Sequence, residues 1–270
     1  MTAYADIGVN LLHPQFADDR EAILNRAKQA GVDKILITAT DIATSKAALN
    51  ACQPGFCYAT AGVHPHDAGA VAGDWMTDLE NISGDDRVCA VGETGLDFNR
   101  NFSPVEDQIT CFDAQINLAC KIQKPLFVHD RESDGEVLRI LSAYTDRLPK
   151  VVIHCFTGTE NDLADYLSAG FYIGITGWVT EKKRGAPLRA MVPSIPLAQL
   201  MVETDAPFLR PHNIVPANSN DATAVPKTRR NEPALLPNVV ASLAELRDES
   251  ATEIAHATRA NAIACFDLAD

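Results

Sequence analysis

The sequence predicts an α/β protein with a closed (β/α)8 barrel, the TIM-barrel architecture. Short apolar runs typical of buried parallel strands recur along the 270 residues, and segments with helical patterns lie between them. Eight such units in a chain of this length favour a closed parallel barrel. An open doubly wound sheet is the alternative. Because no linker or low-complexity stretch divides residues 1–270, we expect a single domain.

The expected strands are apolar nearly throughout, as strands covered by helices on both faces should be. They are residues 6–12, 34–40, 57–63, 88–92, 125–129, 151–155, 171–176 and 200–204. The helical segments between them include 15–30, 104–122 and 159–169, with Gly31 and Gly170 where two helices should end. Residues 209–231 are expected to form a long loop, and such loops in compact domains are usually functional or mobile.

The composition narrows the classes of function. The net charge of −13 argues against a protein that coats nucleic acid by charge alone, because such binding needs a broad basic surface. An enzyme that acts on a polyanion needs positive charge only locally. The longest apolar runs are too short to span a membrane, and we find no secretory signal. Seven cysteines, an odd number without a CxxC pair, suit reduced thiols, so we expect a cytoplasmic protein.

Ligand-type side chains stand at the carboxyl ends of the expected strands. In a barrel these ends converge on one face, so residues that are distant in the sequence should share one pocket there. Two imidazoles and two carboxylates on this face predict a divalent-metal site. Nitrogen ligands suit Zn or Mn, whereas carboxylate and water ligands suit Mg or Mn, so the cation stays open. The residues at these strand ends are Asn10, His64, His66, Glu93, His129, His154 and Asp205.

Each of these residues also has a structural interpretation. A histidine at a strand end is often hydrogen-bonded in the core, Glu93 could cap the next helix, and Asp205 could pair with an arginine. We favour metal ligation because His129 and His154 are expected at one level on adjacent strands, and Glu93 shares their face. Asp205 is expected to be a ligand or a base. Glu203 lies within the last strand, where a supporting role, a salt bridge and a catalytic role are all open.

Basic residues are also expected on the loops of the same face. Arginine forks match phosphate oxygens, and the loops after the last two strands are the usual phosphate site of this fold. We therefore expect contacts to substrate phosphates, although short basic runs are also common on solvated surfaces. The basic residues are Arg131 after the fifth strand, Lys182, Lys183 and Arg184 after the seventh, and Lys227, Arg229 and Arg230 after the eighth.

Aromatic residues on these loops could stack nucleobases, but core packing is their more common role. They are Phe98, Trp178 and Phe208. Of the paired histidines in GVHPHD, one is expected to contact a substrate phosphate and the other to pack. The remaining histidines, His13, His212 and His256, are expected to be ordinary surface or loop residues.

Seven motifs occur in order between Asp6 and about Phe266: DIGVNL, AGVHPHD, GETGLDFNRNFS, HCFTGT, GITGWV, ETDAPFL and RRNEP. Any one of them is weak, whereas seven with this spacing are highly specific. They make the chain resemble the TatD family of metal-dependent deoxyribonucleases, a branch of the amidohydrolase-like barrels.

The resemblance implies a divalent cation, with Mg expected first and Mn or Zn as alternatives. The implied activity is Mg-dependent exonuclease cleavage from the 3′ end of single-stranded DNA or RNA, in repair of oxidative damage. No membrane contact and no obligate protein partner is expected. The residues implied are Glu93, His129 and His154 as ligands, Asp205 to complete the site or activate the water, and His64 with His66 to hold the substrate phosphate.

One departure from the wider family concerns the first strand. Many relatives begin with a His-x-His pair there, whereas this chain has Gly8, Val9 and Asn10. Glycine cannot ligate a metal, and a neutral amide is a poor ligand beside an imidazole. A firmly bound two-metal site is therefore in doubt.

Two other functions stay open. The same site could hydrolyse another bond, such as the ester of a D-aminoacyl-tRNA or an amide, because the ligands alone do not distinguish phosphorus from carbon electrophiles. A non-catalytic binding protein on a barrel scaffold would tolerate the loss of Glu93, His129 and His154. The convergence of ligand-type residues on one face argues against that third interpretation.

Overall fold

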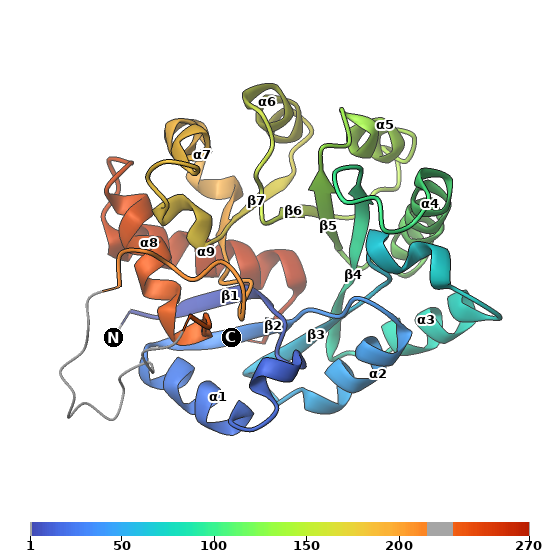
Figure 1. Cartoon of the computed structure of the whole chain (residues 1–270), viewed down its shortest axis with the longest axis horizontal. Helices are drawn as coiled ribbons and strands as arrows, with labels where there is room; N and C mark the ends of the chain where they lie inside the picture. The colour runs from blue at the N-terminus through green and yellow to red at the C-terminus, as the bar shows by residue number, and fades with distance from the viewer. Residues whose placement is uncertain (1, 215–228, 270) are drawn as a thin grey trace.

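The predicted barrel is present in the computed structural model, which describes residues 2–214 and 229–269. Eight parallel strands are hydrogen-bonded in chain order, and helices surround them (Figure 1). The open doubly wound alternative is wrong, because the strand order never reverses. The strands are β1 Tyr4–Val9, β2 Val32–Ile37, β3 Cys57–Ala61, β4 Val88–Asp97, β5 Leu126–Arg131, β6 Val151–His154, β7 Tyr172–Ile175 and β8 Leu200–Val202.

Helices connect the strands and form the outer layer of the barrel. The α-helices are α1 Arg20–Gln29, α2 Ile42–Ala51, α3 Trp75–Ser83, α4 Val105–Ile122, α5 Glu136–Ser142, α6 Glu160–Ser168, α7 Ala186–Met191, α8 Leu236–Ala244 and α9 Ala251–Phe266. The 3-10 helices are η1 Pro14–Phe16, η2 Pro65–Ala70, η3 Gly177–Thr180, η4 Val192–Ser194, η5 Leu197–Gln199 and η6 Pro233–Leu235.

The seam between β8 and β1 is closed by a few specific bonds. Val9 forms a parallel bridge with Ala206, whose carbonyl accepts from the Asn10 amide at 2.8 Å. The buried Asp6 carboxylate accepts from the Thr204 amide at 2.8 Å and from its hydroxyl at 2.6 Å. These contacts place the segment after β8 beside the end of β1, where the site residues lie.

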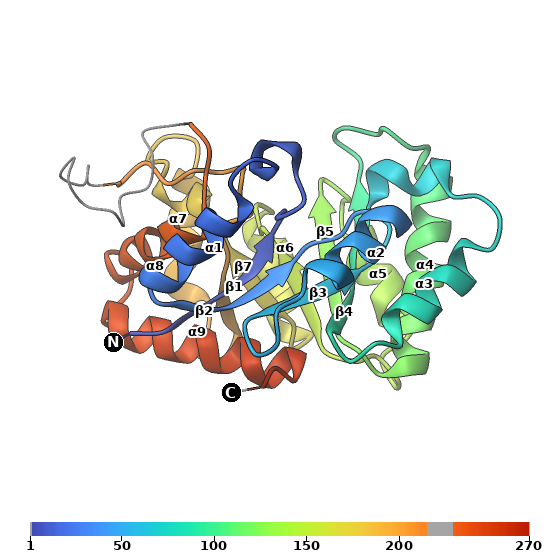
Figure 2. The same ribbon diagram turned by 90° about the horizontal axis from the view of Figure 1, so that it is seen from below.

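Two apolar layers hold the strands in place. The larger layer packs the outer faces of the strands against the helices, and it explains why the strand sequences are almost continuously apolar. A smaller cluster fills the barrel interior, where Phe127 and Met201 join Cys265 and Phe266 of α9. Figure 2 shows α9 lying along the end of the barrel at which the strands start. The opposite end, where the strands finish, is therefore the end available for a site.

The element boundaries differ from the sequence prediction mainly at strand ends. Strand β4 extends to Asp97 instead of ending at residue 92, so that Glu93 lies inside the strand and not after it. The segment 15–30 is divided, because η1 forms before α1 begins at Arg20. Gly31 and Gly170 do end two helices, with φ values of 88° and 79° in the left-handed region.

Two expectations from the composition concern membrane-spanning helices and the state of the cysteines. Within residues 2–214 and 229–269, none of the helices combines the length and apolar character needed to cross a bilayer. The cysteines are all free thiols, and five of them are buried. Burial raises the pKa of the Cys57 thiol to about 12, which agrees with an unreactive structural role.

Candidate metal centre and active site

Four neighbouring strands bring ligand-type side chains together at their carboxyl ends. His64 follows β3, Glu93 lies within β4, His129 lies near the end of β5, and His154 is the last residue of β6. His129 and His154 are paired across the β5–β6 ladder, which puts both imidazoles at one level of the barrel. The predicted convergence of these residues is therefore confirmed.

Glu93 occupies the middle of this group. Its Oε1 atom lies 3.2 Å from His64 Nε2, 3.1 Å from His129 Nδ1 and 3.1 Å from His154 Nε2. Glu93, His64 and His154 are buried, and His129 is partly buried. One carboxylate oxygen thus contacts three imidazoles in a site with little solvent. We call these four residues the Glu93 cluster.

A β-bulge directs Glu93 toward the histidines. Gly92 pairs with Phe127 and Thr94 pairs with Val128, so Glu93 is an extra residue in β4 without a partner on β5. Gly95, two residues later, has a φ of 135°, and a Cβ there would lie 1.9 Å from the His129 carbonyl oxygen. Only glycine allows β4 to approach β5 this closely. The GETG sequence therefore serves to position the carboxylate.

Asp97, which was not among the predicted site residues, forms a second acidic contact with the histidines. Its Oδ2 lies 2.6 Å from His66 Nε2 and 3.6 Å from His129 Nε2. The backbone amides of Asn99 and Arg100 donate to its Oδ1 at 3.1 and 2.8 Å. The spacing of four residues from Glu93 in GETGLD was a usable signal, since even spacings share one face of a strand. His66 is accordingly held by Asp97 and does not join the Glu93 cluster.

Glu203 supports the cluster from the opposite side of His154. Its Oε2 lies 2.9 Å from His154 Nδ1, and its Oε1 accepts from the Cys155 amide at 2.5 Å. A Cβ built on Gly8 would lie 2.3 Å from Glu203 Oε2. The fully buried Glu203 carboxylate therefore fills the space that a side chain at position 8 would enter. A side chain at position 8 would therefore require Glu203 to shift.

Asp205 lies at the edge of the site and is held by Asn10, which directly follows the first strand. Asn10 Nδ2 donates to Asp205 Oδ1 at 2.8 Å, and the Asp205 amide donates to the Gly8 carbonyl at 2.8 Å. Burial raises the pKa of Asp205 to about 7, while the nearby His154 opposes that increase. The side-chain amide of Asn10 thus orients the Asp205 carboxylate.

Within the Glu93 cluster, the charged groups shift one another's pKa values. Burial alone would raise the pKa of Glu93, but His154 and His64 hold it well below its usual range. Burial likewise disfavours the charged form of His154, but Glu203 and Glu93 raise its pKa well above the ordinary value. Burial lowers the pKa of His64 to about 4, so this imidazole is neutral and can donate a lone pair.

A divalent cation fits this donor set. Within the described part of the chain, the donor atoms of His64, Glu93 and His129 lie within 4.8 Å of one another. Two atoms that each lie about 2.1 Å from a common ion are roughly 3 Å apart, close to the spacings around Glu93 Oε1. His129 Nε2 is buried and has no hydrogen-bond partner. The compact group includes His64, for which we expected a phosphate contact, and excludes the expected ligands His154 and Asp205.

The basic residues are distributed over several environments. Arg131 is exposed at the end of β5, and Arg229 is exposed beyond β8, whereas Lys227 lies outside the described residues. Arg230 is largely buried and contacts Asp19 at 2.6 Å and Glu232 at 2.9 Å. These acids already occupy its guanidinium group, which the phosphate-contact prediction did not take into account. Arg230 therefore joins the segment after β8 to the start of α1.

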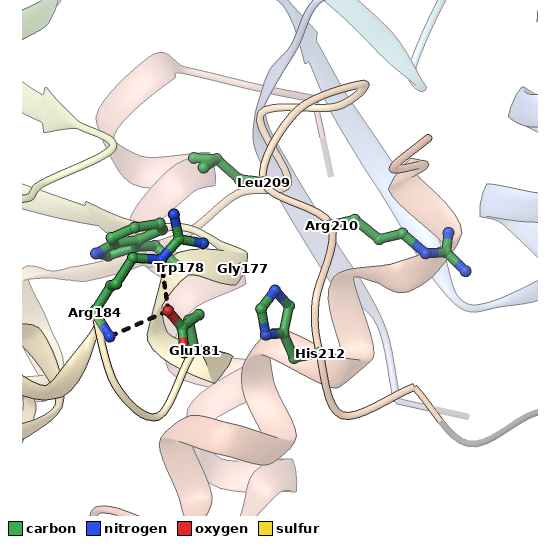
Figure 3. Close-up of a pocket in the computed structure, with 7 residues that line it drawn as sticks. All are labelled: Gly177, Trp178, Glu181, Arg184, Leu209, Arg210 and His212. Atoms are coloured by element: carbon green, nitrogen blue, oxygen red, sulfur yellow. Dashed lines mark hydrogen bonds and ion pairs between the residues drawn. The ribbon is translucent and has the colours of Figure 1, made fainter. Parts of the chain in front are cut away.

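A cavity of about 200 Å³ lies between η3 and the segment after β8 (Figure 3). Trp178 forms part of its lining, and the Arg184 guanidinium lies 5.0 Å from the centroid of the Trp178 ring. Glu181 holds Arg184 through a 2.8 Å ion pair. His212, which the sequence analysis treated as an ordinary loop residue, also lines this cavity, as do Gly177, Leu209 and Arg210.

Comparison with known proteins places this architecture in a family. Residues 5–267 match the family model described as TatD related DNase. The 3′-5′ ssDNA/RNA exonuclease TatD of Edwardsiella piscicida is 46% identical over 98% of this chain and 99% of its own length. The protein of the same name from Pectobacterium carotovorum is 45% identical, with the same coverage of both chains. The crystal structure of a TatD homologue from Escherichia coli K12 superimposes with a TM-score of 0.87 at 30% identity, covering 98% of each chain.

Proposed function

This chain belongs to the family of TatD related DNases, and we propose that it acts as a metal-dependent 3′–5′ exonuclease on single-stranded DNA or RNA. As a member of that family it is a hydrolase of phosphodiester bonds in nucleic acid. One observation carries the proposal: Glu93 Oε1 lies within 3.2 Å of three imidazole nitrogens at the carboxyl ends of the strands. A buried acid surrounded by imidazoles on this face is a suitable centre for a metal-assisted hydrolase.

We propose Glu93, His64 and His129 as the initial ligands of the cation, with His154 and Asp205 available to complete the site. Mg is our first expectation from the family resemblance, and the imidazole donors make Mn or Zn suitable alternatives. When bound, such a cation lowers the pKa of a water and neutralises charge on a phosphoryl oxygen. The buried neutral His64 side chain and the ionised Glu93 carboxylate are the forms that ligation requires.

The surrounding residues would orient the reaction. Glu203 accepts a hydrogen bond from His154 Nδ1, so that Nε2 faces Glu93. Asp205, oriented by Asn10, is the carboxylate placed to accept a proton from the attacking water, with Glu93 as the alternative acceptor. His66, held by Asp97, lies beside the His64 ring of the Glu93 cluster and is proposed to contact a substrate phosphate. The exposed Arg131, at the end of β5, and Arg229 are proposed to do the same.

A degradation ladder tests the proposal directly. Purified protein would be incubated with 5′-labelled single-stranded DNA and RNA in the presence of Mg, Mn or Zn, and bound metal would be measured in parallel. We expect products that shorten one nucleotide at a time from the 3′ end, and loss of both turnover and bound metal in Glu93→Gln and His129→Ala. Turnover near the wild-type rate in both folded variants would contradict the metal mechanism.

The same experiment separates the alternative ester hydrolase. If single strands stay intact while D-aminoacyl-tRNA is deacylated, the metal site serves a carbon electrophile and the nuclease proposal is wrong.

A cytoplasmic location and a role in repair of oxidative DNA damage belong to our proposal as well. Cell fractionation and the peroxide sensitivity of a deletion strain would test those two statements.

A further inference from the structure

Two phenylalanines on the loops at the carboxyl ends of the strands are exposed to solvent. Phe102 is 67% exposed and Phe208 is 43% exposed, and within the described residues the only other exposed large hydrophobic side chain is Val105 at 37%. Exposed aromatic rings offer no folding benefit, since burial is what makes such side chains stabilising. Both rings are carried by loops at the carboxyl ends of the strands, where a ligand of the candidate active site could cover them.

Each phenylalanine makes a T-shaped contact with a histidine. The Phe102 and His66 rings are 4.7 Å apart at 68°, and the Phe208 and His13 rings are 5.2 Å apart at 79°. A T-shaped contact is one of the arrangements that aromatic rings prefer, and it helps to fix the orientation of both rings. His66 is in turn held by Asp97, so Phe102 is linked to the site through two contacts.

The two rings are carried by loops that follow opposite strands of the barrel. Phe102 is on the segment after β4, and Phe208 is on the segment after β8, three residues beyond Asp205. Strands β4 and β8 are four places apart in an eight-stranded ring, which makes them opposite members of the barrel. A polymer that crosses the mouth from one side to the other would pass over the Glu93 cluster.

We propose that Phe102 and Phe208 form a two-sided base-stacking clamp, which holds the nucleotides on either side of the scissile bond. The inference rests on the proposed nuclease function and adds the residues that hold the substrate. Base stacking on an aromatic face tolerates any base, as an exonuclease that works along a strand requires. A double-stranded substrate would keep its bases stacked on one another, so the clamp also selects single strands.

The strand is expected to continue on the Phe208 side. Phe208 is followed directly by Leu209 and Arg210, which line the cavity that contains Trp178 and Arg184 (Figure 3). A guanidinium group next to an indole ring offers contacts to both a phosphate and a base. The nucleotide beyond the clamp would therefore bind at this cavity, with the chain end on the Phe102 side.

Substrates of different length test each contact separately. We would measure KM and kcat of Phe102→Ala, Phe208→Ala and Trp178→Ala on dT8, on the dinucleotide dTpdT and on the same dinucleotide with an abasic 5′ nucleotide, which has one base and no other aromatic ring. Both phenylalanine variants should raise KM for dT8 and dTpdT by roughly 5- to 150-fold, the range of base–aromatic stacking, with a much smaller change in kcat. On the one-base substrate only one of them should have this effect. Trp178→Ala should raise KM for dT8 but not for dTpdT.

Two controls keep the test specific. Val105→Ala removes the third exposed hydrophobic side chain and should leave KM for dT8 unchanged. Phe102→Trp and Phe208→Trp keep an aromatic ring, so their KM for dT8 should be close to that of the wild type. If the wild type cleaves dT8 and the alanine variants retain its KM, the clamp is wrong and the nuclease function stands. Equal KM increases in both variants on the one-base substrate would also overturn the clamp. If the wild type cleaves none of the three substrates with Mg or Mn, the proposed function itself fails.

Discussion

Glu203 and His154 form a buried pair in which Glu203 Oε2 lies 2.9 Å from His154 Nδ1. The other nitrogen of the same imidazole, Nε2, lies 3.1 Å from Glu93 Oε1. The ring is therefore held between two carboxylates, one at the centre of the site and one behind it. Such an arrangement fixes the tautomer and the orientation of a ligating histidine.

Removing the charge of Glu203 should weaken the site without removing any residue of the Glu93 cluster. We expect Glu203→Gln to lower turnover or metal affinity about 10- to 100-fold, the usual cost of losing the partner of a ligating histidine. Nuclease kinetics with a metal titration would measure both effects. Glu136→Gln, which breaks an exposed pair with Arg139, is the matched control. Equal behaviour of the two variants would show that Glu203 does not orient His154.

The close approach at Gly95 should make this position intolerant of any side chain. Gly95→Ala would place a methyl group 1.9 Å from the His129 carbonyl oxygen at a φ of 135°, so we expect a loss of at least about 3 kcal/mol in the free energy of unfolding. Gly73→Ala is the control, because Gly73 also has a positive φ but has open space around its Cβ position. That control should cost only about 1 kcal/mol. Similar urea midpoints for both variants would contradict the steric argument.

Arg230 should contribute to stability more than to substrate binding. Its side chain is 16% exposed and joins Asp19 to the fully buried Glu232, which Arg26 also contacts at 2.8 Å. We expect Arg230→Ala to lower the free energy of unfolding by about 1–3 kcal/mol and to change KM for an oligonucleotide little. Arg229→Ala should do the reverse. If Arg230→Ala had wild-type stability and a large increase in KM, Arg230 would contact substrate phosphates as the sequence predicted.

Asp6 should make stability depend on pH. Burial raises its pKa to about 8, although hydrogen bonds from Thr204 oppose the increase. Because the folded state keeps a proton that the unfolded carboxyl releases near pH 4, this stabilisation is complete below about pH 4 and is lost as the pH rises to about 8. Asp6→Asn cannot titrate. The difference in unfolding free energy between wild type and Asp6→Asn should therefore fall with pH, by up to about 1.4 kcal/mol per unit.

Denaturant unfolding of both proteins at pH 5, 6.5 and 8 would check this prediction. Other titrating groups are shared by the two proteins, so they cancel in the difference. A difference that stays constant over this range would mean that Asp6 is already ionised in the folded protein at pH 5.

The sequence by itself determined the barrel and most members of its site. Strand and helix patterns are local properties of the chain, and parallel strands in a barrel must end on the same face, so His129 and His154 could be placed together before any coordinates. His64 was placed on the correct face but was given a phosphate contact, because sequence spacing does not reveal which imidazole reaches Glu93.

Only the tertiary structure decided the contacts that depend on register and packing. The bulge in β4 moves Glu93 into the strand, and it depends on how β4 pairs with β5. Glu203, which directly follows β8, meets His154 of β6, two places away in the sheet, and Arg230 pairs with Asp19, the residue before α1. Each of these facts involves residues far apart in the chain. Short-range periodicity carries no information about which distant side chain fills a given space.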